Sequence, residues 1–124
     1  MTIEKLGTGK YLLLTTFRKD GTAVPTPVWV VADGQALYAW SAADAGKVKR
    51  IRRDGAVLLA ECDFKGNPSG PSQPGTARLM DAEGTERVRE LIKRKYGITG
   101  RLTLLGSLLR RGKSGTVGIE LRSR

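Results

Sequence analysis

The chain has 124 residues and carries 22 Lys and Arg against 12 Asp and Glu, which gives a net charge of +10. We expect residues 1–124 to form one domain with a single core, and the positive charge indicates an anionic partner. The absence of histidine excludes the usual Ser-His and Cys-His nucleophile pairs and most zinc and non-haem iron sites, so we expect no metal centre.

The first part of the chain has the pattern of an antiparallel meander. Tyr11–Phe17 is rich in apolar and β-favouring residues and is followed by an Asp-Gly pair at position 20. Because Asp-Gly is a strong hairpin signal, we expect Thr22–Val31 to return antiparallel to the first strand. A second Asp-Gly pair, at position 33, turns the chain into a third strand, Ala36–Ser41.

The middle of the chain continues with a short helix and two strands. Ala43–Asp54 is predicted to be helical, with Val48 and Ile51 as a narrow apolar stripe. Ala56–Cys62 is a fourth strand, and Thr76–Met80 is a fifth after a loop rich in Gly, Pro and Ser.

The last third holds the clearest helix, Glu83–Tyr96, which Gly97 ends. Arg101–Arg111 is ambiguous between a helix and an apolar lid, and Thr116–Arg122 alternates as a half-exposed strand. Six strands joined mostly by hairpins, with inserted helices, predict a mainly β protein: a six-stranded antiparallel barrel.

The predicted helix Ala43–Asp54 carries an unusual density of positive charge. Lys49, Arg52 and Arg53 share its outward face, whereas Lys47 and Arg50 form a separate pair that starts in the first turn. Cations in a first turn oppose the helix dipole unless an anion binds there, so a phosphate beside Ser41, Gly46 and Lys47 would be attracted. A nucleic-acid patch, a phosphate cradle and a solvated helix face are the three interpretations.

The strand Thr22–Val31 contains a second feature, the segment VPTPVW. Pro25 and Pro27 remove two backbone donors from the same edge, which either leaves a slot or protects an edge strand from aggregation. Trp29 and Trp40 flank this region and supply aromatic walls for a slot.

The chain shows no sign of membrane insertion or export. No apolar run approaches the ~20 residues of a membrane span, and MTIEKLGTGK at the start lacks the apolar region of a signal peptide. We expect a cytoplasmic protein with no membrane partner. The one cysteine, Cys62, cannot form an internal disulfide, and we expect a half-buried structural thiol.

Three segments follow one another in a specific order and spacing: YLLLTTFRKDGTAVPTPVWVV, LYAWSAADAGKVKRIRRDGAVLLAECDFKGNPSGP and TARLMD. Together they resemble the pyridoxamine 5′-phosphate oxidase-like superfamily, whose fold is the FMN-binding split β-barrel. Within it, the small actinobacterial reductases that use the deazaflavin coenzyme F420 are the most similar. The likeness runs from about Tyr11 to Tyr96.

The resemblance implies a cofactor site. In the superfamily the cofactor phosphate is held at the end of the third strand and the start of the next helix, which corresponds here to Ser41, Gly46, Lys47 and Arg50. The ring lies against the second strand, with one residue of the first strand nearby; the corresponding residues are Thr16, Thr26, Pro27, Val28 and Trp29.

One departure bears on the choice of cofactor. FMN oxidases of the superfamily usually carry Arg-Lys at the phosphate position, where this chain has Gly46-Lys47. The resemblance therefore implies F420, whose polyanionic lactyl-oligoglutamate tail suits the positive charge, with FMN as the alternative. The expected activity is hydride transfer between reduced cofactor and a small unsaturated organic substrate. Such a reaction needs no catalytic motif, since the cofactor carries the chemistry, and the sequence assigns no catalytic residue.

Three other interpretations remain open at this stage. The same fold could bind FMN as an oxidoreductase, or carry a cofactor without turnover, and the basic helix could belong to a nucleic-acid-binding module, although no such motif is present. We also expect a homodimer, because Tyr11–Phe17 and Ala56–Cys62 are apolar on both faces. The resemblance implies cofactor sites at the interface between the subunits.

Overall fold

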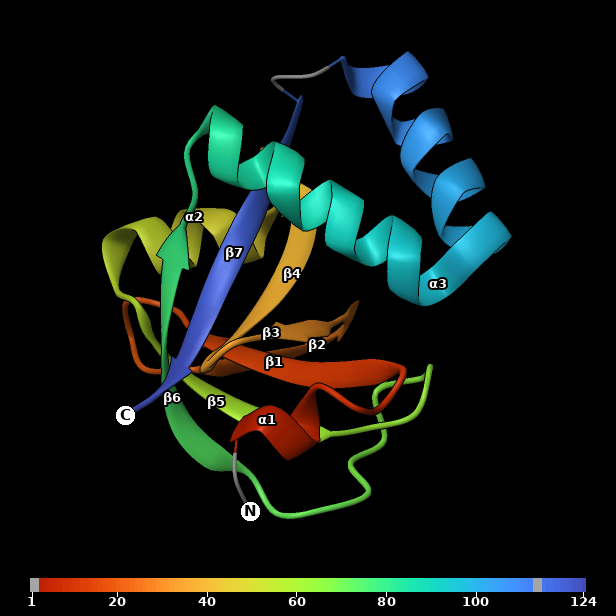
Figure 1. Cartoon of the computed structure of the whole chain (residues 1–124). Helices are drawn as coiled ribbons and strands as arrows, with labels where there is room; N and C mark the ends of the chain where they lie inside the picture. The colour runs from red at the N-terminus through yellow and green to blue at the C-terminus, as the bar shows by residue number, and fades with distance from the viewer. Residues whose placement is uncertain (1–2, 113–114) are drawn as a thin grey trace.

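The computed structural model describes residues 3–112 and 115–124. Within these residues one antiparallel sheet has the strand order β2-β1-β5-β6-β7-β4-β3. The sheet curls into a split barrel: β1, β2 and β5 lie across the steeper β4, β6 and β7 (Figure 1). The strands are β1 (Tyr11–Phe17), β2 (Ala23–Trp29), β3 (Val31–Asp33), β4 (Ala36–Ala42), β5 (Ala56–Glu61), β6 (Gln73–Leu79) and β7 (Thr116–Ser123), and the helices are α1 (Ile3–Leu6), α2 (Gly46–Arg53) and α3 (Ala82–Arg111).

The described part of the chain has seven strands where the sequence predicted six, because the strand expected at Thr22–Val31 is broken at Val30. Its first part, β2, pairs with β1, and its second part, β3, pairs with β4 at the opposite edge of the sheet. At the break, the Val30 N–H donates to Tyr96 Oη at 3.0 Å and the Val30 carbonyl accepts from Lys95 Nζ at 2.6 Å. Side chains of α3 thus replace the ladder bonds that Val30 would have made.

The other predicted elements are present, with differences at their ends. The expectation that Thr116–Arg122 is half-exposed was wrong: most of β7 is buried, because α3 packs against it. β1 has the predicted bounds, and both Asp-Gly pairs lie between antiparallel strands, β1 with β2 and β3 with β4. The helix predicted from Ala43 begins at Gly46, after a turn in which the Ala45 N–H donates to the Ala42 carbonyl. The sequence did not predict α1, which buries Ile3 and Leu6 at the base of the barrel.

Two hydrophobic clusters hold these elements together. The larger fills the barrel and includes Leu12, Leu14, Leu37, Leu59 and Ile119, all fully buried. The smaller joins α3 to the outer face of the sheet; its members are Val31, Val88, Ile92 and Leu104, with Trp29, Tyr38, Trp40, Leu91 and Tyr96 packed against them. In this way α3 covers the outer face of β4 and β7.

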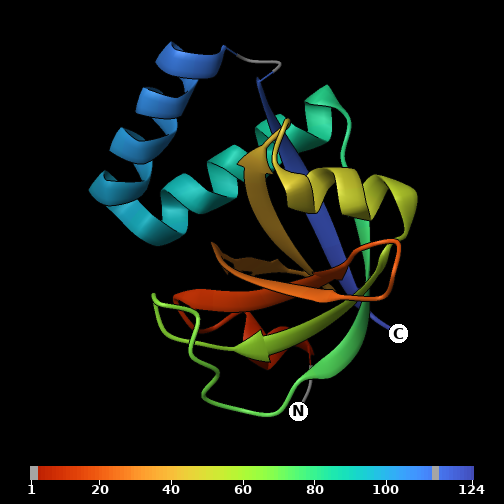
Figure 2. The ribbon, with the colours of Figure 1, turned by 180° about the vertical axis from the view of Figure 1, so that it is seen from behind.

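Gly97 divides α3 into two halves that point in different directions, as Figure 2 also shows from behind. Its backbone angles are φ 60° and ψ −135°, so Gly97 ends the first half as the sequence predicted. The chain then resumes as a helix to Arg111, which resolves the ambiguous segment Arg101–Arg111 as helical. Among the described residues, no helix is both long enough and apolar enough to cross a bilayer.

We predict that Gly97→Ala lowers the free energy of unfolding by about 1–3 kcal/mol, because a side chain is strained at these angles. Gly106→Ala is the matched control within the same helix, since a Cβ added there meets nothing within 4 Å. Alanine is the better helix former, so we expect this control to be neutral or slightly stabilised. Urea denaturation of both variants makes the comparison, and equal stabilities would contradict the strained geometry at Gly97.

Candidate functional site

The candidate site lies where β4 ends and α2 begins. Ser41 is buried near the end of β4, and Gly46 and Lys47 form the first turn of α2. Ala45, which precedes the helix, provides no side-chain cap, and the first turn contains no acidic residue. The free N–H groups and the positive end of the helix dipole are therefore available to an anion.

A cavity of about 370 Å³ opens beside this helix start. Its volume is within the range of small-molecule and cofactor sites. The wall combines two indole rings with a hydroxyl, an ammonium group and small residues: Pro27, Val28, Trp29, Trp40, Ser41, Ala42, Ala45, Lys47 and Thr103. Segments distant in sequence, from β2, β4, α2 and the second half of α3, meet here.

Five of the nine predicted site residues line this cavity; they are Pro27, Val28, Trp29, Ser41 and Lys47. The other four do not line it. Thr26 is part of β2, and its hydroxyl donates to the Leu14 carbonyl at 3.3 Å, across the strand pair. Thr26 thus supports the strand rather than facing the cavity.

The remaining three, Thr16, Gly46 and Arg50, form one contact group. Arg50 Nε donates to the buried Thr16 Oγ1 at 2.6 Å. The Arg50 guanidinium folds back over the helix start, where a Cβ built on Gly46 would lie 2.8 Å from Arg50 Nη1. Gly46 leaves room for Arg50 in this position, and Arg50 adds a second positive charge beside Lys47.

Lys47 is an uncompensated cation. The side chain is half-buried, and among the described residues no carboxylate pairs with it. Burial, and to a smaller extent the charge of Arg50, lowers the pKa of Lys47 below its usual value. By contrast, Lys49, Arg52 and Arg53 are exposed on the outer face of α2, as predicted. The half-buried charge of Lys47 costs free energy when no ligand is bound, and it favours the binding of an anionic ligand.

A residue of α3 holds part of the aromatic wall of the cavity in place. Trp29 stacks on Tyr96, with ring centroids 4.3 Å apart and an interplanar angle of 9°. The Tyr96 hydroxyl donates to the Lys10 carbonyl at 2.6 Å, so the ring under Trp29 is itself held. Trp40 Nε1 is buried and finds no hydrogen-bond partner among the described residues, so an indole that lines the same cavity as Trp29 has an unsatisfied donor.

Sequence reasoning missed two contributors, Tyr96 and Thr103. Both belong to α3, and no local pattern marks either one. Thr103 reaches the cavity only because the helix bends at Gly97. Their roles depend on how α3 packs against the sheet.

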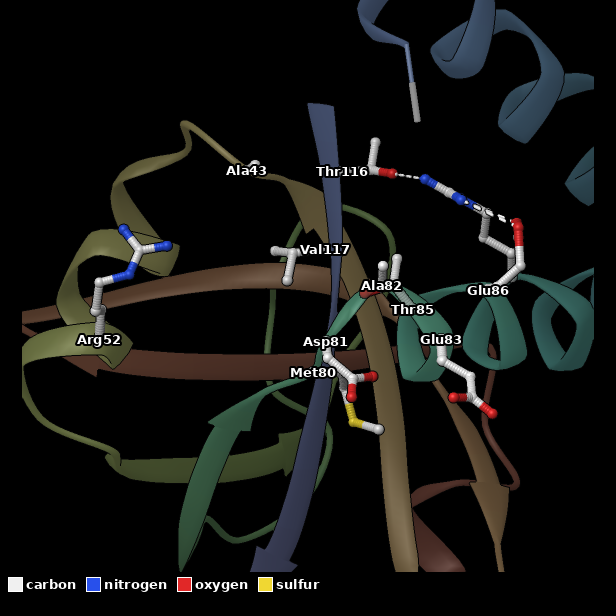
Figure 3. A pocket seen from close by; sticks show the side chains of 11 residues that line it. Ala43, Arg52, Met80, Asp81, Ala82, Glu83, Thr85, Glu86, Thr116 and Val117 are labelled. Carbon is white, nitrogen blue, oxygen red and sulfur yellow. Dashed lines mark hydrogen bonds and ion pairs between the residues drawn. The ribbon is translucent and has the colours of Figure 1, made fainter. Parts of the chain in front are cut away.

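A second cavity, of about 610 Å³, lies on the other side of the α2 start, between α2, β7 and the first turns of α3 (Figure 3). Asp81, Glu83 and Glu86 line it, and none of the predicted site residues does. The Arg89 guanidinium donates to Glu86 Oε1 at 2.9 Å and also to Thr116 Oγ1. These carboxylates do not suit a phosphate.

Other reactive groups are sparse in the described part of the chain. No three His, Cys, Asp or Glu side chains come together there as a metal site. Cys62 is half-buried, as expected, and burial followed by the charge of Asp63 raises the pKa of its thiol. A thiol with a raised pKa is a poor nucleophile.

The residues present fit a phosphorylated aromatic cofactor. The uncapped helix start with Lys47 suits a phosphate, and the apolar wall of Pro27, Trp29 and Trp40 suits a flat ring. The orphaned Trp40 N–H is a donor that a ring carbonyl or nitrogen would satisfy.

We predict that Lys47→Met makes the free protein more stable at neutral pH, because it removes a half-buried charge. The gain should shrink as the pH rises. Lys47, whose pKa is lowered from 10.5 on folding, loses its proton at a lower pH when folded than when unfolded. Urea denaturation at a series of pH values, from neutral pH up to 10.5, measures the effect. The exposed Lys49→Met is the matched control. A less stable Lys47→Met would show that the charge is compensated.

Comparison with known proteins gives matches at the level of structure. No protein-family model and no curated protein matches the sequence. A Listeria innocua protein named as a candidate pyridoxamine 5′-phosphate oxidase is 20% identical, with a TM-score of 0.66 over 96% of this chain and 87% of its own. An F420 reductase is 21% identical, with a TM-score of 0.66 over 98% of this chain and 92% of its own.

The haem storage protein HutZ from Vibrio cholerae is 12% identical, with a TM-score of 0.65 over 100% of this chain and 92% of its own. Proteins with different tasks thus share this architecture. At such identities the likeness concerns the fold, and it agrees with the fold that the resemblance in sequence implied. The chain has the split β-barrel fold of the pyridoxamine 5′-phosphate oxidase-like proteins, and an F420 reductase is among the proteins that share it.

Proposed function

We propose that the protein is an F420-dependent oxidoreductase that reduces a small unsaturated organic substrate. The observation that carries this proposal is Lys47: a half-buried cation with no carboxylate partner among the described residues, in the first turn of an uncapped helix, at the edge of a cavity with indole walls. A lysine that only kept the surface soluble would not have to be half-buried beside a cavity. The structural likeness to an F420 reductase supports the same proposal.

The residues of the site bind and orient the cofactor. Lys47 and the N–H groups at the start of α2 hold the phosphate, and a bound phosphate turns the electrostatic cost of the empty site into attraction. Arg50, kept in place by its bond to Thr16, adds positive charge on the same side.

The apolar wall positions the ring. Trp29, which the stack on Tyr96 immobilises, and Pro27 of the edge strand β2 give the ring a rigid surface and exclude water from one face. The bound deazaflavin supplies the hydride chemistry. Thr103 borders the same cavity from α3, where a substrate beside the ring would lie.

The choice of F420 over FMN rests on charge. Gly46 precedes Lys47, so one side chain rather than two reaches the phosphate from the first turn. The exposed cations Lys49 and Arg52 then attract a polyanionic tail that leaves the cavity. The second candidate is an FMN-binding oxidoreductase at the same site. A carrier without turnover is the third, since a haem storage protein has this fold.

We further propose that the protein acts as a homodimer with the cofactor sites at the interface. The outer faces of the adjacent strands β1 and β5 carry the half-buried Leu13 and Leu58. A second copy packed on these leucines would bury apolar surface that one subunit leaves in contact with water.

We predict that Lys47→Ala weakens F420 binding by roughly ten- to hundredfold, the equivalent of about 1.5–3 kcal/mol for a charge-assisted contact. Lys49→Ala removes the same charge from the outer face of the same helix, and we expect it to change affinity only a few-fold. Fluorescence polarisation with one F420 stock at fixed salt compares the variants.

The same titration with FMN separates the cofactors. F420 should bind more tightly, and added salt should narrow the difference because it screens the tail. Tighter, salt-insensitive binding of FMN would assign the site to FMN instead. If Lys47→Ala bound F420 like the wild type while Lys49→Ala did not, the phosphate site would be wrong and binding through the outer face of α2 would replace it.

We predict that the wild-type protein sediments as a dimer at micromolar concentration. Leu58→Glu, which places a charge on the outer face of β5, should shift the protein towards monomer and weaken F420 binding at the same time. Phe64→Glu, at a position exposed in the loop after β5, is the control. A wild type that sediments as a monomer would argue against both the dimer and the interfacial site.

A further inference from the structure

The second half of α3 has an apolar stripe that nothing covers in the described part of the chain. Ile98, Leu102, Leu105 and Leu109 follow the spacing i, i+4, i+7 and i+11, which places them on one face of a helix. Their exposed fractions are 77%, 65%, 51% and 80%. Figures 1 and 2 show this half of α3 at the margin of the molecule, with no other element on its outer side.

The opposite face of the same helix is the one that packs. Gly100, Leu104 and Ser107 repeat the spacing i, i+4 and i+7, and all three are buried against the body of the protein. The helix is therefore oriented by its inner face. The outer stripe is consequently not needed to hold α3 on the sheet.

The surroundings of the stripe are positively charged. Between Glu90 and Glu120 the sequence has no acidic residue, whereas seven Lys or Arg residues fall in the same stretch. Arg101 and Arg110, both exposed, stand next to Leu102 and Leu109. Apolar side chains flanked by cations, without a carboxylate nearby, are typical of helices that lie on an anionic membrane surface.

We propose that the outer face of this half of α3 docks on an anionic lipid bilayer, with the leucine stripe inserted among the acyl chains and the flanking arginines at the headgroups. The protein lies on the surface in this mode and does not span it. The proposal does not depend on which cofactor the cavity binds.

Charge favours an anionic bilayer as the partner of this stripe over a second copy of the chain or a nucleic acid. A second copy would bring its own acid-free, basic stretch against the first, so like charges would face each other. A nucleic acid would satisfy the arginines but not four exposed aliphatic side chains, which phosphates do not contact favourably. A bilayer that contains anionic lipid offers favourable contacts both to the arginines and to the aliphatic side chains.

The test is co-sedimentation of the whole protein with vesicles of phosphatidylcholine, with and without phosphatidylglycerol. We expect binding to vesicles that contain phosphatidylglycerol and at least about tenfold weaker binding to phosphatidylcholine alone. The double variant Leu102→Ser/Leu105→Ser should bind the anionic vesicles at least about tenfold more weakly than the wild type, because two apolar side chains no longer insert. Arg101→Gln should reduce the preference for anionic lipid.

Phe64→Ser is the matched control, since Phe64 is exposed to 65%, the same as Leu102, but lies in the loop after β5 and not on α3. Urea denaturation checks that the double variant is folded, as expected for exposed positions. Failure of the wild type to bind, or a double variant that binds as well as the wild type, would overturn the proposal. A change of oligomeric state in the double variant would also overturn the proposal, because the stripe would then be an interface with a second copy of the chain.

Discussion

The crossing at Val30 is the constraint on which the rest of the structure depends. Here the chain leaves one edge of the sheet at β2 and joins the opposite edge at β3, so its peptide groups cannot stay in a ladder. Buried peptide groups need partners, and α3 supplies them through Lys95 and Tyr96. Lys95 Nζ also donates to the carbonyl groups of Gly7 and Gly9, at 2.8 and 2.5 Å. One ammonium group thus joins the crossing, the segment before β1 and the helix, and burial lowers its pKa as a consequence.

The same crossing builds the candidate site. Trp29 is the last residue of β2, and its stack on Tyr96 fixes the indole at the cavity wall. β4 returns beside it with Trp40 and Ser41 and leads directly into α2, which presents Lys47. Since the wall comes from four separate elements, its shape depends on the packing of α3 rather than on any one loop. The site therefore holds the half-buried charge of Lys47, which is costly unless an anion binds beside it.

Fold and function have to be argued separately for this architecture. A haem storage protein and an F420 reductase are both similar in fold to this chain at low identity, so the barrel alone does not choose a ligand. The features of this chain that bear on the ligand are local: Gly46 before Lys47, the bond between Arg50 and Thr16, and indoles around the cavity. The second half of α3 adds a feature of another kind, because its inner face belongs to the cavity and the core while its outer face remains apolar and exposed.

The elements with local signals could be predicted from the sequence. Asp-Gly pairs placed the hairpins, Gly97 ended a helix, and Val48 with Ile51 set the inward face of α2, which left Lys47 in its first turn. These features depend on neighbours within one or two turns of chain, and the structure has them. Only the tertiary structure decided where β2 ends, because the break at Val30 depends on side chains 65 and 66 residues further along the chain. It likewise decided that Tyr96 and Thr103 belong to the site and that the leucines of α3 face outward, since each depends on how a bent helix packs on a curled sheet.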